Sequence, residues 1–296
     1  MKLYQLGYLI MACPQPAKYD YYASGGTIGT FGAPQFNDPV QGKYLQNCSL
    51  ISAFASLAWK GKIPAQPAGP QTTYSFQFYN PNKLQQVDGM TPLDANTKLL
   101  HAKSDTENEI WPALYEKAYY MWLDNINNSS GRPDYCKYAA WQSPVTVLNQ
   151  LTGMNALQKD CQRDFTSSDA VFSYINDTLC ANFNPIATNR TLMYPAAAWT
   201  YNPNVRNPYG VTFSDATIAA QHTYSLLGVT GTKAGATWTS KFIVLRNPYG
   251  KGKGDPGGVT LYNGNWCNNN LGISDGLFAL AVDQFMKYFE GFTWVV

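Results

Sequence analysis

The feature that most constrains the fold is an apolar run from Leu50 to Trp59, which follows Asn47, Cys48 and Ser49. The run presents apolar or small side chains on every side of a helix, so the sequence predicts a buried helix and not a surface one. Gly61 and Pro64 predict where it ends. A chain of 296 residues is long enough to build a core around such a helix, as one large domain or as two lobes.

Cys48 falls in the first turn of this predicted helix, where backbone N–H groups give the helix a positive end. We expect the Asn47 side-chain oxygen to accept one of these N–H groups. A positive helix end and a neighbouring imidazolium both favour a thiolate, which makes Cys48 a candidate nucleophile. Gln41 lies seven residues upstream, and its amide could donate to an oxyanion beside the Cys48 backbone N–H. A cysteine found alone is more often a buried structural thiol, so the assignment depends on a base elsewhere.

The chain has two histidines, which nearly forces the choice of that base. His101 lies in a Lys/Leu/Ala stretch without a comparable partner, whereas His222 lies at the start of a β-rich segment. Asn247 ends a second β-rich segment, just before Pro248. Alone, each has a more common structural interpretation, as a core histidine and as a turn residue. Together with Cys48 they form the set a thiol hydrolase needs: a nucleophile, a proton carrier and an amide that orients it.

The two β-rich segments, 223–229 and 241–246, flank a turn-rich stretch and therefore predict a β-hairpin. Paired residue numbers have a constant sum in an antiparallel pair. If Gly228 pairs with Lys241, the candidate histidine also pairs with the candidate asparagine. A slip of one residue would turn the side chains to opposite faces. The sequence thus predicts that these two side chains meet at the open end of the hairpin.

The chain resembles the calpain family of papain-like cysteine peptidases, and the matching segments span most of its length. They surround the candidate cysteine, histidine and asparagine and include one further helical segment; a weaker match lies near the C-terminal end. These segments are Asp38–Ala58, Glu109–Tyr119, Gln221–Ser225, Leu245–Gly250 and Asp275–Phe285.

This resemblance implies a two-lobed α+β fold of the papain type, with a helical first lobe, a β-rich second lobe and the active site in the cleft. The order of helical and β-rich segments favours the same class. We expect an extended lead-in over 1–37, a helical lobe carrying the cysteine over 38–200, and a β-rich lobe carrying the histidine and the asparagine over 201–296. The implied function is a calpain-like cysteine endopeptidase that hydrolyses protein or peptide substrates through a Cys48–His222–Asn247 triad.

The chain departs from the family pattern at three places near the cysteine. The family places its glutamine six residues before the cysteine, and Gln41 lies seven before. The family has Gly-Asp just before the cysteine and an aromatic residue just after it, and here these are Gln46-Asn47 and Ser49. These departures motivate an alternative, a catalytically weak or inactive protease-fold module that binds partners or has a structural role. A transglutaminase-like acyl transferase would use an acid as its third residue, which Asn247 argues against.

Calcium is the one cofactor that the resemblance suggests, since calpains need it in the protease core. Asp38 matches one ligand position of the family, whereas the Cys–His chemistry itself requires no cofactor. The expected role of a cation there is to fix the loop that leads to Cys48. A regulatory partner and the substrate preference are not readable from the sequence.

Composition argues against several other classes of protein. The net charge of +2 is scattered along the chain without a basic run, which does not suggest nucleic acid, and no apolar stretch is long enough to span a bilayer. Charged residues make up 14%, which favours an extracytoplasmic or secreted protein while leaving a cytoplasmic one open. The six cysteines include no Cys-X-X-Cys pair, which argues against structural zinc. We expect one disulfide among Cys136, Cys161 and Cys180 in an oxidising compartment.

Overall fold

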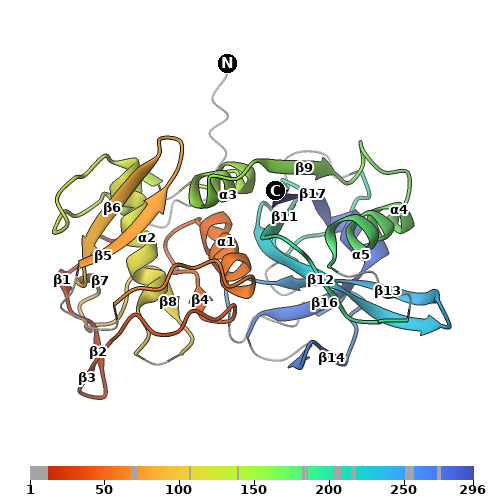
Figure 1. The fold of residues 1–296 in the computed structure, drawn as a ribbon, viewed down its shortest axis with the longest axis horizontal. Helices are drawn as coiled ribbons and strands as arrows, with labels where there is room; N and C mark the ends of the chain where they lie inside the picture. Colours follow the sequence, from red (N-terminus) through yellow and green to blue (C-terminus); the bar gives the residue numbers. More distant parts are fainter. Residues whose placement is uncertain are drawn as a thin grey trace.

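The computed structural model describes residues 13–67, 73–106, 108–138, 140–181, 184, 186–202, 208–214, 218–250, 257–271 and 275–296. Helices gather with short strand pairs on one side of the molecule, and one large sheet with further helices occupies the other (Figure 1). Helix α1 (Cys48–Trp59) lies between the two sides and packs against the sheet. The first residue of α1 is the candidate nucleophile.

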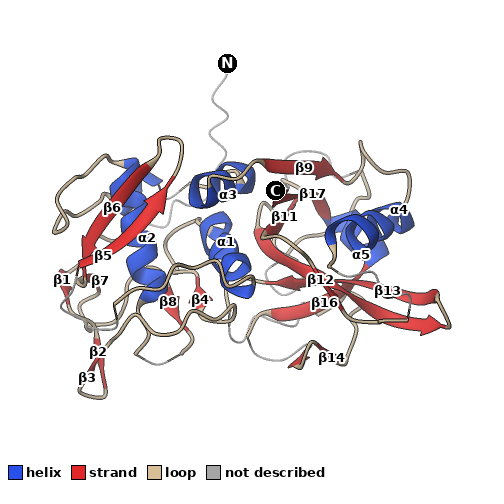
Figure 2. Cartoon of the chain, viewed as in Figure 1, coloured by secondary structure: helices blue, strands red, loops and turns tan. Residues whose placement is uncertain are grey.

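The described helices are mostly short, and they lie on both sides of the molecule (Figure 2). Helix α1 ends as the sequence predicted, with Gly61 in a left-handed conformation at φ +61° just after it. The others are α2 (Trp111–Leu123), α3 (Pro144–Thr152), α4 (Ser168–Ser173) and α5 (Val282–Tyr288), with a 3₁₀ turn η1 (Tyr135–Tyr138) and a π-helical turn η2 (Tyr174–Leu179).

The large sheet has seven antiparallel strands among the described residues. Its order is β16-β13-β12-β11-β17-β9, and β10 pairs with β12 beside this path. The strands are β9 (Ala156–Asp160), β10 (Arg190–Thr191), β11 (Ala196–Thr200), β12 (Thr223–Ala234), β13 (Thr237–Arg246), β16 (Leu277–Ala281) and β17 (Phe289–Val295).

The remaining strands form two-stranded pairs, β1 with β7, β2 with β3, β4 with β8, β5 with β6 and β14 with β15. They are β1 (Lys18–Asp20), β2 (Ala23–Ser24), β3 (Thr27–Ile28), β4 (Pro39–Val40), β5 (Thr73–Phe78), β6 (Lys83–Asp88), β7 (Thr91–Leu93), β8 (Lys103–Ser104), β14 (Asn265–Trp266) and β15 (Asn269–Asn270).

Apolar burial divides into separate cores. One core joins α1, α2 and α3 to the β5–β6 pair and is rich in stacked aromatic rings, such as Phe54 on Tyr115. A second core lies between the large sheet and α4, η2 and α5. A third, smaller core covers the other side of β13 and β16 and includes the fully buried Trp266.

The distribution of strands differs from the expected division into 38–200 and 201–296. The large sheet also takes in β9, β10 and β11, all within the range expected to be helical. The sequence 156–160 does not predict a strand, because it has no β-branched or aromatic residue; pairing with β17 overrides that local preference. The described part of the lead-in, from Cys13 onward, includes strands β1 to β3, and β1 pairs with β7.

One disulfide joins Cys13 to Cys136, with 5.6 Å between their Cα atoms. The expected pairing among Cys136, Cys161 and Cys180 is therefore wrong. Cys161 and Cys180 are free thiols buried in the second core, where burial raises the pKa of Cys180 to about 12. Nearness in sequence misled the prediction, because the true partner lies 123 residues away.

None of the helices in the described segments has the length and apolar character needed to cross a bilayer.

Candidate active site

Cys48 is the first residue of α1 and only 2% of it is exposed. Asn47 precedes it at the helix N-terminus but makes no side-chain capping hydrogen bond, contrary to our expectation. Its amide Nδ2 instead donates to Glu116 Oε1 on α2, 2.5 Å away. Nδ2 is the donor end of the amide, so this bond connects the start of α1 to α2 and does not cap the helix.

Burial raises the pKa of the Cys48 thiol, and hydrogen bonding to Thr223 and Ser49 opposes that rise. The direction is opposite to the lowering expected from the helix end alone. Because a thiolate in an apolar site needs a compensating charge, activation of Cys48 would depend on a positively charged partner.

His222 and Asn247 are in contact. His222 Nε2 lies 3.1 Å from Asn247 Oδ1, and the two residues are only 4% and 6% exposed. The same oxygen accepts the backbone N–H of Tyr249 at 3.0 Å, which fixes the orientation of the amide. The Tyr249 ring lies 4.5 Å from the His222 ring, centroid to centroid, and covers it. The imidazole is thus held at Nε2, and Nδ1 is its other proton-exchanging atom.

The strand register that predicted this contact is wrong in detail. Lys241 pairs with Gly231 and not with Gly228, because β12 continues to Ala234 and the turn is shorter than expected. An irregularity between Leu226 and Gly228 then shifts the register by one residue toward the open end. The histidine consequently lies two residues from the position directly opposite Asn247. An even offset keeps both side chains on one face, so they meet as diagonal neighbours.

Arg246 ties the asparagine segment to the loop that leads to Cys48. Its guanidinium is fully buried and donates to Pro39 O at 2.8 Å and to Asn37 O at 2.6 Å. The Gln41 backbone N–H also crosses between the segments and donates to Pro248 O at 2.8 Å. Sequence reasoning missed Arg246, although an arginine at the end of an apolar strand was a signal for buried polar pairing.

Gln41, the candidate oxyanion donor, turns its side-chain Nε2 to Leu45 O at 2.6 Å. This bond lies within the loop that carries one residue more than the family pattern. One of the two Nε2 hydrogens is used there, which leaves one to donate elsewhere. Gly42 follows with no room for a side chain, since a Cβ there would lie 2.6 Å from the His101 Cα.

A cavity of about 330 Å³ brings these segments together. Cys48, His222, Tyr249 and Gln41 line it, so the candidate nucleophile, base and oxyanion donor face one space. Its other lining residues are Gln46, Phe213, Ser214, Ala219, Ala220 and Gln221, which the sequence did not single out for this role.

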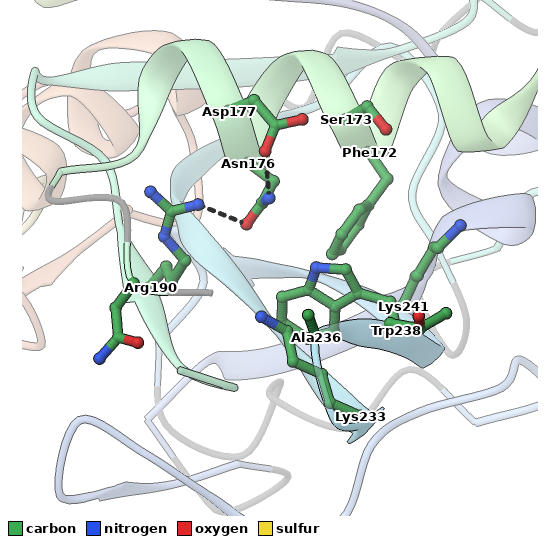
Figure 3. A pocket seen from close by; sticks show the side chains of 11 residues that line it. Phe172, Ser173, Asn176, Asp177, Arg190, Lys233, Ala236, Trp238 and Lys241 are labelled. Atoms are coloured by element: carbon green, nitrogen blue, oxygen red, sulfur yellow. Dashed lines mark hydrogen bonds between the residues drawn. The ribbon is translucent and has the colours of Figure 1, made fainter. Parts of the chain in front are cut away.

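A second cavity lies on the sheet side, between α4–η2 and the tip of the β12–β13 hairpin (Figure 3). Arg190 points to Asn176 there, and Lys233 lies over the Trp238 ring, 4.2 Å from its centroid. Its lining residues include no cysteine and no histidine. The paired chemistry of a thiol hydrolase is therefore found in the first cavity and not in this one.

Asp38, the candidate calcium ligand, is fully buried and already accepts three hydrogen bonds, from Gln35 N, Thr106 Oγ1 and Trp111 Nε1. Burial and the Asp38 charge raise the pKa of the neighbouring Glu109 to about 7. Calcium takes about six to eight oxygens, and two adjacent carboxyl groups supply only some of them. Across the segments that the structure describes, no group of three or more His, Cys, Asp or Glu side chains could hold a metal. These side chains thus fit calcium only in part.

Comparison with known proteins decides the family. The family model described as calpain family cysteine protease matches residues 31–293. The chain belongs to the calpain family of cysteine proteases. Among curated proteins, the calpain-like protease palB/RIM13 of Candida albicans is 33% identical over 93 residues, which cover 29% of this chain and 13% of that relative.

Membership in the calpain family implies a papain-like fold and places the chain among the thiol proteases, which are hydrolases. The mixture of helices with an antiparallel sheet agrees with this α+β class. The matched part of the Candida protein is a small share of its length, so its name describes that protein and not this one.

Proposed function

We propose that this calpain-family chain is a cysteine endopeptidase whose triad is Cys48, His222 and Asn247. The observation that carries the proposal is the buried 3.1 Å contact between His222 Nε2 and Asn247 Oδ1, beside a cavity that Cys48 and His222 both line. An amide at this position argues against the transglutaminase-like reading, which needs an acid. Protein or peptide substrates follow from the family.

The chemistry follows from these groups. The Cys48 thiol transfers its proton to His222 Nδ1, and the thiolate attacks the carbonyl carbon of the scissile peptide bond. The carbon–sulfur bond forms, and the carbon–nitrogen bond breaks as His222 returns the proton to the leaving amine. Water, deprotonated by His222, then cleaves the thioester and releases the acid, and the proton returns to the sulfur. The Cys48 N–H and the Gln41 amide are the proposed donors to the oxyanion.

We also propose that the first cavity is the cleft between a helical lobe carrying Cys48 and a β-rich lobe carrying His222 and Asn247. The separate cores around α1–α3 and around the large sheet support this division. Since β9 to β11 belong to the sheet, we place them with the β-rich lobe.

Alkylation with a substoichiometric thiol reagent tests the nucleophile. Cys267 is the natural control, because it is a free thiol and more exposed than Cys48. We expect mass spectrometry to find the label on Cys48, since activation by His222 outweighs access. Preferential labelling of Cys267 would show that Cys48 is an ordinary buried thiol.

Substitutions test the chemistry on a peptide substrate. Cys48→Ala and His222→Ala should lower kcat by roughly 10⁴-fold or more, because they remove the groups that make and break bonds. Asn247→Ala should leave a reduced but measurable rate, because Asn247 only orients the imidazole. If the wild-type protein neither hydrolyses the peptide nor reacts with an epoxide thiol inhibitor, that result would favour the alternative, an inactive protease-fold module. The extra residue between Gln41 and Cys48, with the Gln41 amide turned to Leu45 O, is the observation behind that alternative.

A further inference from the structure

Two hydroxyl groups lie beside the proposed Cys48–His222 dyad and join its two halves. Ser49 follows Cys48 in α1, and Thr223 follows His222 at the start of β12. Ser49 Oγ and Thr223 Oγ1 are 2.9 Å apart, and both residues are fully buried. Because each hydroxyl belongs to the covalent neighbour of a dyad member, this bond fixes the separation of the two segments independently of the dyad.

The direction of this hydrogen bond can be worked out from its neighbours. Ser49 Oγ also lies 2.6 Å from Gln142 O, and a carbonyl only accepts, so the single Ser49 hydrogen is directed there. Thr223 must then donate to Ser49. Trp141 Nε1 in turn donates to Thr223 Oγ1 at 3.3 Å. The chain of bonds runs from Trp141 through Thr223 and Ser49 to Gln142 and ends on the residue next to its start, so both hydroxyls are held from two sides.

Helix α1 also holds Thr223 by its backbone. Ser52 Oγ donates to Thr223 O at 2.8 Å, and Ser225 Oγ donates back to Ser52 O at 2.8 Å. One turn farther along α1, Ser56 Oγ accepts the Ala196 N–H at 2.6 Å. Ser49, Ser52 and Ser56 therefore form a polar stripe, spaced three and four residues apart, along the face of α1 that meets the sheet.

We propose that Ser49 and Thr223 are positioning residues for the dyad: their hydroxyl pair sets the approach of the Cys48 thiol to the His222 imidazole and so favours the thiolate–imidazolium form. This rests on the proposed function. Ser49 stands where the family usually has an aromatic residue. The serine, rather than marking a lost activity, supplies a hydrogen bond that an aromatic side chain could not make.

One observation and one general argument support this role. Burial raises the pKa of Cys48, and hydrogen bonding led by the Thr223 backbone opposes that rise. The hydroxyl pair acts indirectly, by holding Thr223 against α1, because both hydroxyl hydrogens are already used. Misplacement of reacting groups by about 1 Å can lower the rate about 100-fold, so a hydrogen bond that fixes the two segments beside the dyad can strongly affect the rate. Within the described residues, the titratable groups near Cys48 are His222 and Tyr249, which line the same cavity, and Tyr120 on α2. None of the hydroxyl variants below changes any of them.

The test measures the rate of Cys48 alkylation by iodoacetamide against pH, together with kcat and KM for a peptide. Thr223→Val removes the hydroxyl at constant shape, and Thr223→Ser keeps it; Ser49→Ala removes the other partner. Ser56→Ala is the matched control, because it deletes a buried hydrogen bond of the same stripe away from the dyad. Unfolding by urea reports the stability of each variant.

We expect Thr223→Val and Ser49→Ala each to lower kcat about tenfold with KM nearly unchanged, and to move the alkylation profile to higher pH. Thr223→Ser should keep the wild-type profile, and Ser56→Ala should lose stability without changing it. The double variant should be little worse than either single one, because each breaks the same bond.

Two results would overturn the inference, and they differ. In the first, the pH profile of alkylation changes in His222→Ala but stays as in the wild type in Thr223→Val and Ser49→Ala. This would show that the hydroxyl pair only packs the interface. A His222→Ala variant with the wild-type profile would show that there is no dyad, which removes the proposed function as well.

Discussion

Glu116 allows a quantitative prediction about stability, because it is a carboxylic acid held inside the protein. The side chain is fully buried on α2, where Ala102 N donates to Oε2 at 3.0 Å and Asn47 Nδ2 donates to Oε1. Burial raises the pKa of Glu116 from 4.5 to about 8, and these two hydrogen bonds only partly oppose the rise. The folded protein therefore keeps this proton at neutral pH, whereas the unfolded chain releases it.

The sign and size of the effect follow by linkage. A pKa raised on folding contributes stability that is fully present below 4.5 and is lost as pH rises through about 8. Each unit of pKa difference corresponds to about 1.4 kcal/mol, so the loss across this window has an upper limit on the order of 5 kcal/mol. Other titrating groups also make the unfolding free energy depend on pH, and comparison with a variant that lacks only the Glu116 carboxyl group cancels their contribution.

The Glu116→Gln protein supplies that comparison, because glutamine has nearly the same shape, keeps an acceptor oxygen and does not titrate. Urea unfolding of both proteins between about pH 5 and about pH 9 should show the wild type losing several kcal/mol relative to the variant as pH rises, with most of the loss below about pH 8. Curves that stay parallel to within about 1 kcal/mol would refute the claim that burial keeps Glu116 protonated.

Three further outcomes follow from the structure. Burial lowers the pKa of His101 from 6.5 to about 4, so its contribution to stability is present above pH 6.5 and is lost as pH falls through 4. The His101→Phe protein should therefore unfold at a lower pH than the wild type, with a gain in unfolding free energy at acid pH of at most roughly 3 kcal/mol. Equal acid midpoints would contradict this. If Asp38 and Glu109 complete a cation site with backbone oxygens, millimolar calcium should raise peptide hydrolysis over chelator in the wild type and not in Asp38→Asn or Glu109→Gln. Equal wild-type rates in both conditions would exclude the switch. Arg246→Met should cost about 2–4 kcal/mol, because it strands two carbonyl acceptors, and should lower kcat by loosening the loop before Cys48; thermal melts and kinetics that match wild type would contradict that account.

The contact between His222 and Asn247 was predictable because it depends on parity more than on exact register. The predicted pairing of Gly228 with Lys241 was wrong by three residues, since the strand continues farther than its composition suggests. The irregularity after Leu226 removed one residue of that error, and the remaining even offset preserved the shared face. Hydrophobic alternation specifies which face a side chain occupies more strongly than which residue it faces.

Polar contacts inside the core were the least predictable part of the site. Asn47 was expected to cap α1 by local rules, but its partner Glu116 is 69 residues away. The serines of α1 looked neutral in a pattern of apolar and small residues, and only the arrival of β12 gives them partners. Local sequence propensity cannot predict such hydrogen bonds, because the fold brings together a donor and an acceptor that are far apart in the sequence.

If Cys48 is the nucleophile as proposed, the Cys13–Cys136 bond places the protein under two opposed redox demands. The 123-residue span that it closes contains α1 and α2, and losing a cross-link of that length would give the unfolded chain an entropic advantage of about 5 kcal/mol in the loop-closure account. Reductants that keep a nucleophilic thiol in its active form also attack disulfides by thiolate exchange. Activity measured against reductant concentration should therefore rise and then fall, and the surroundings that suit this protein are those in which one free thiol and one disulfide survive together.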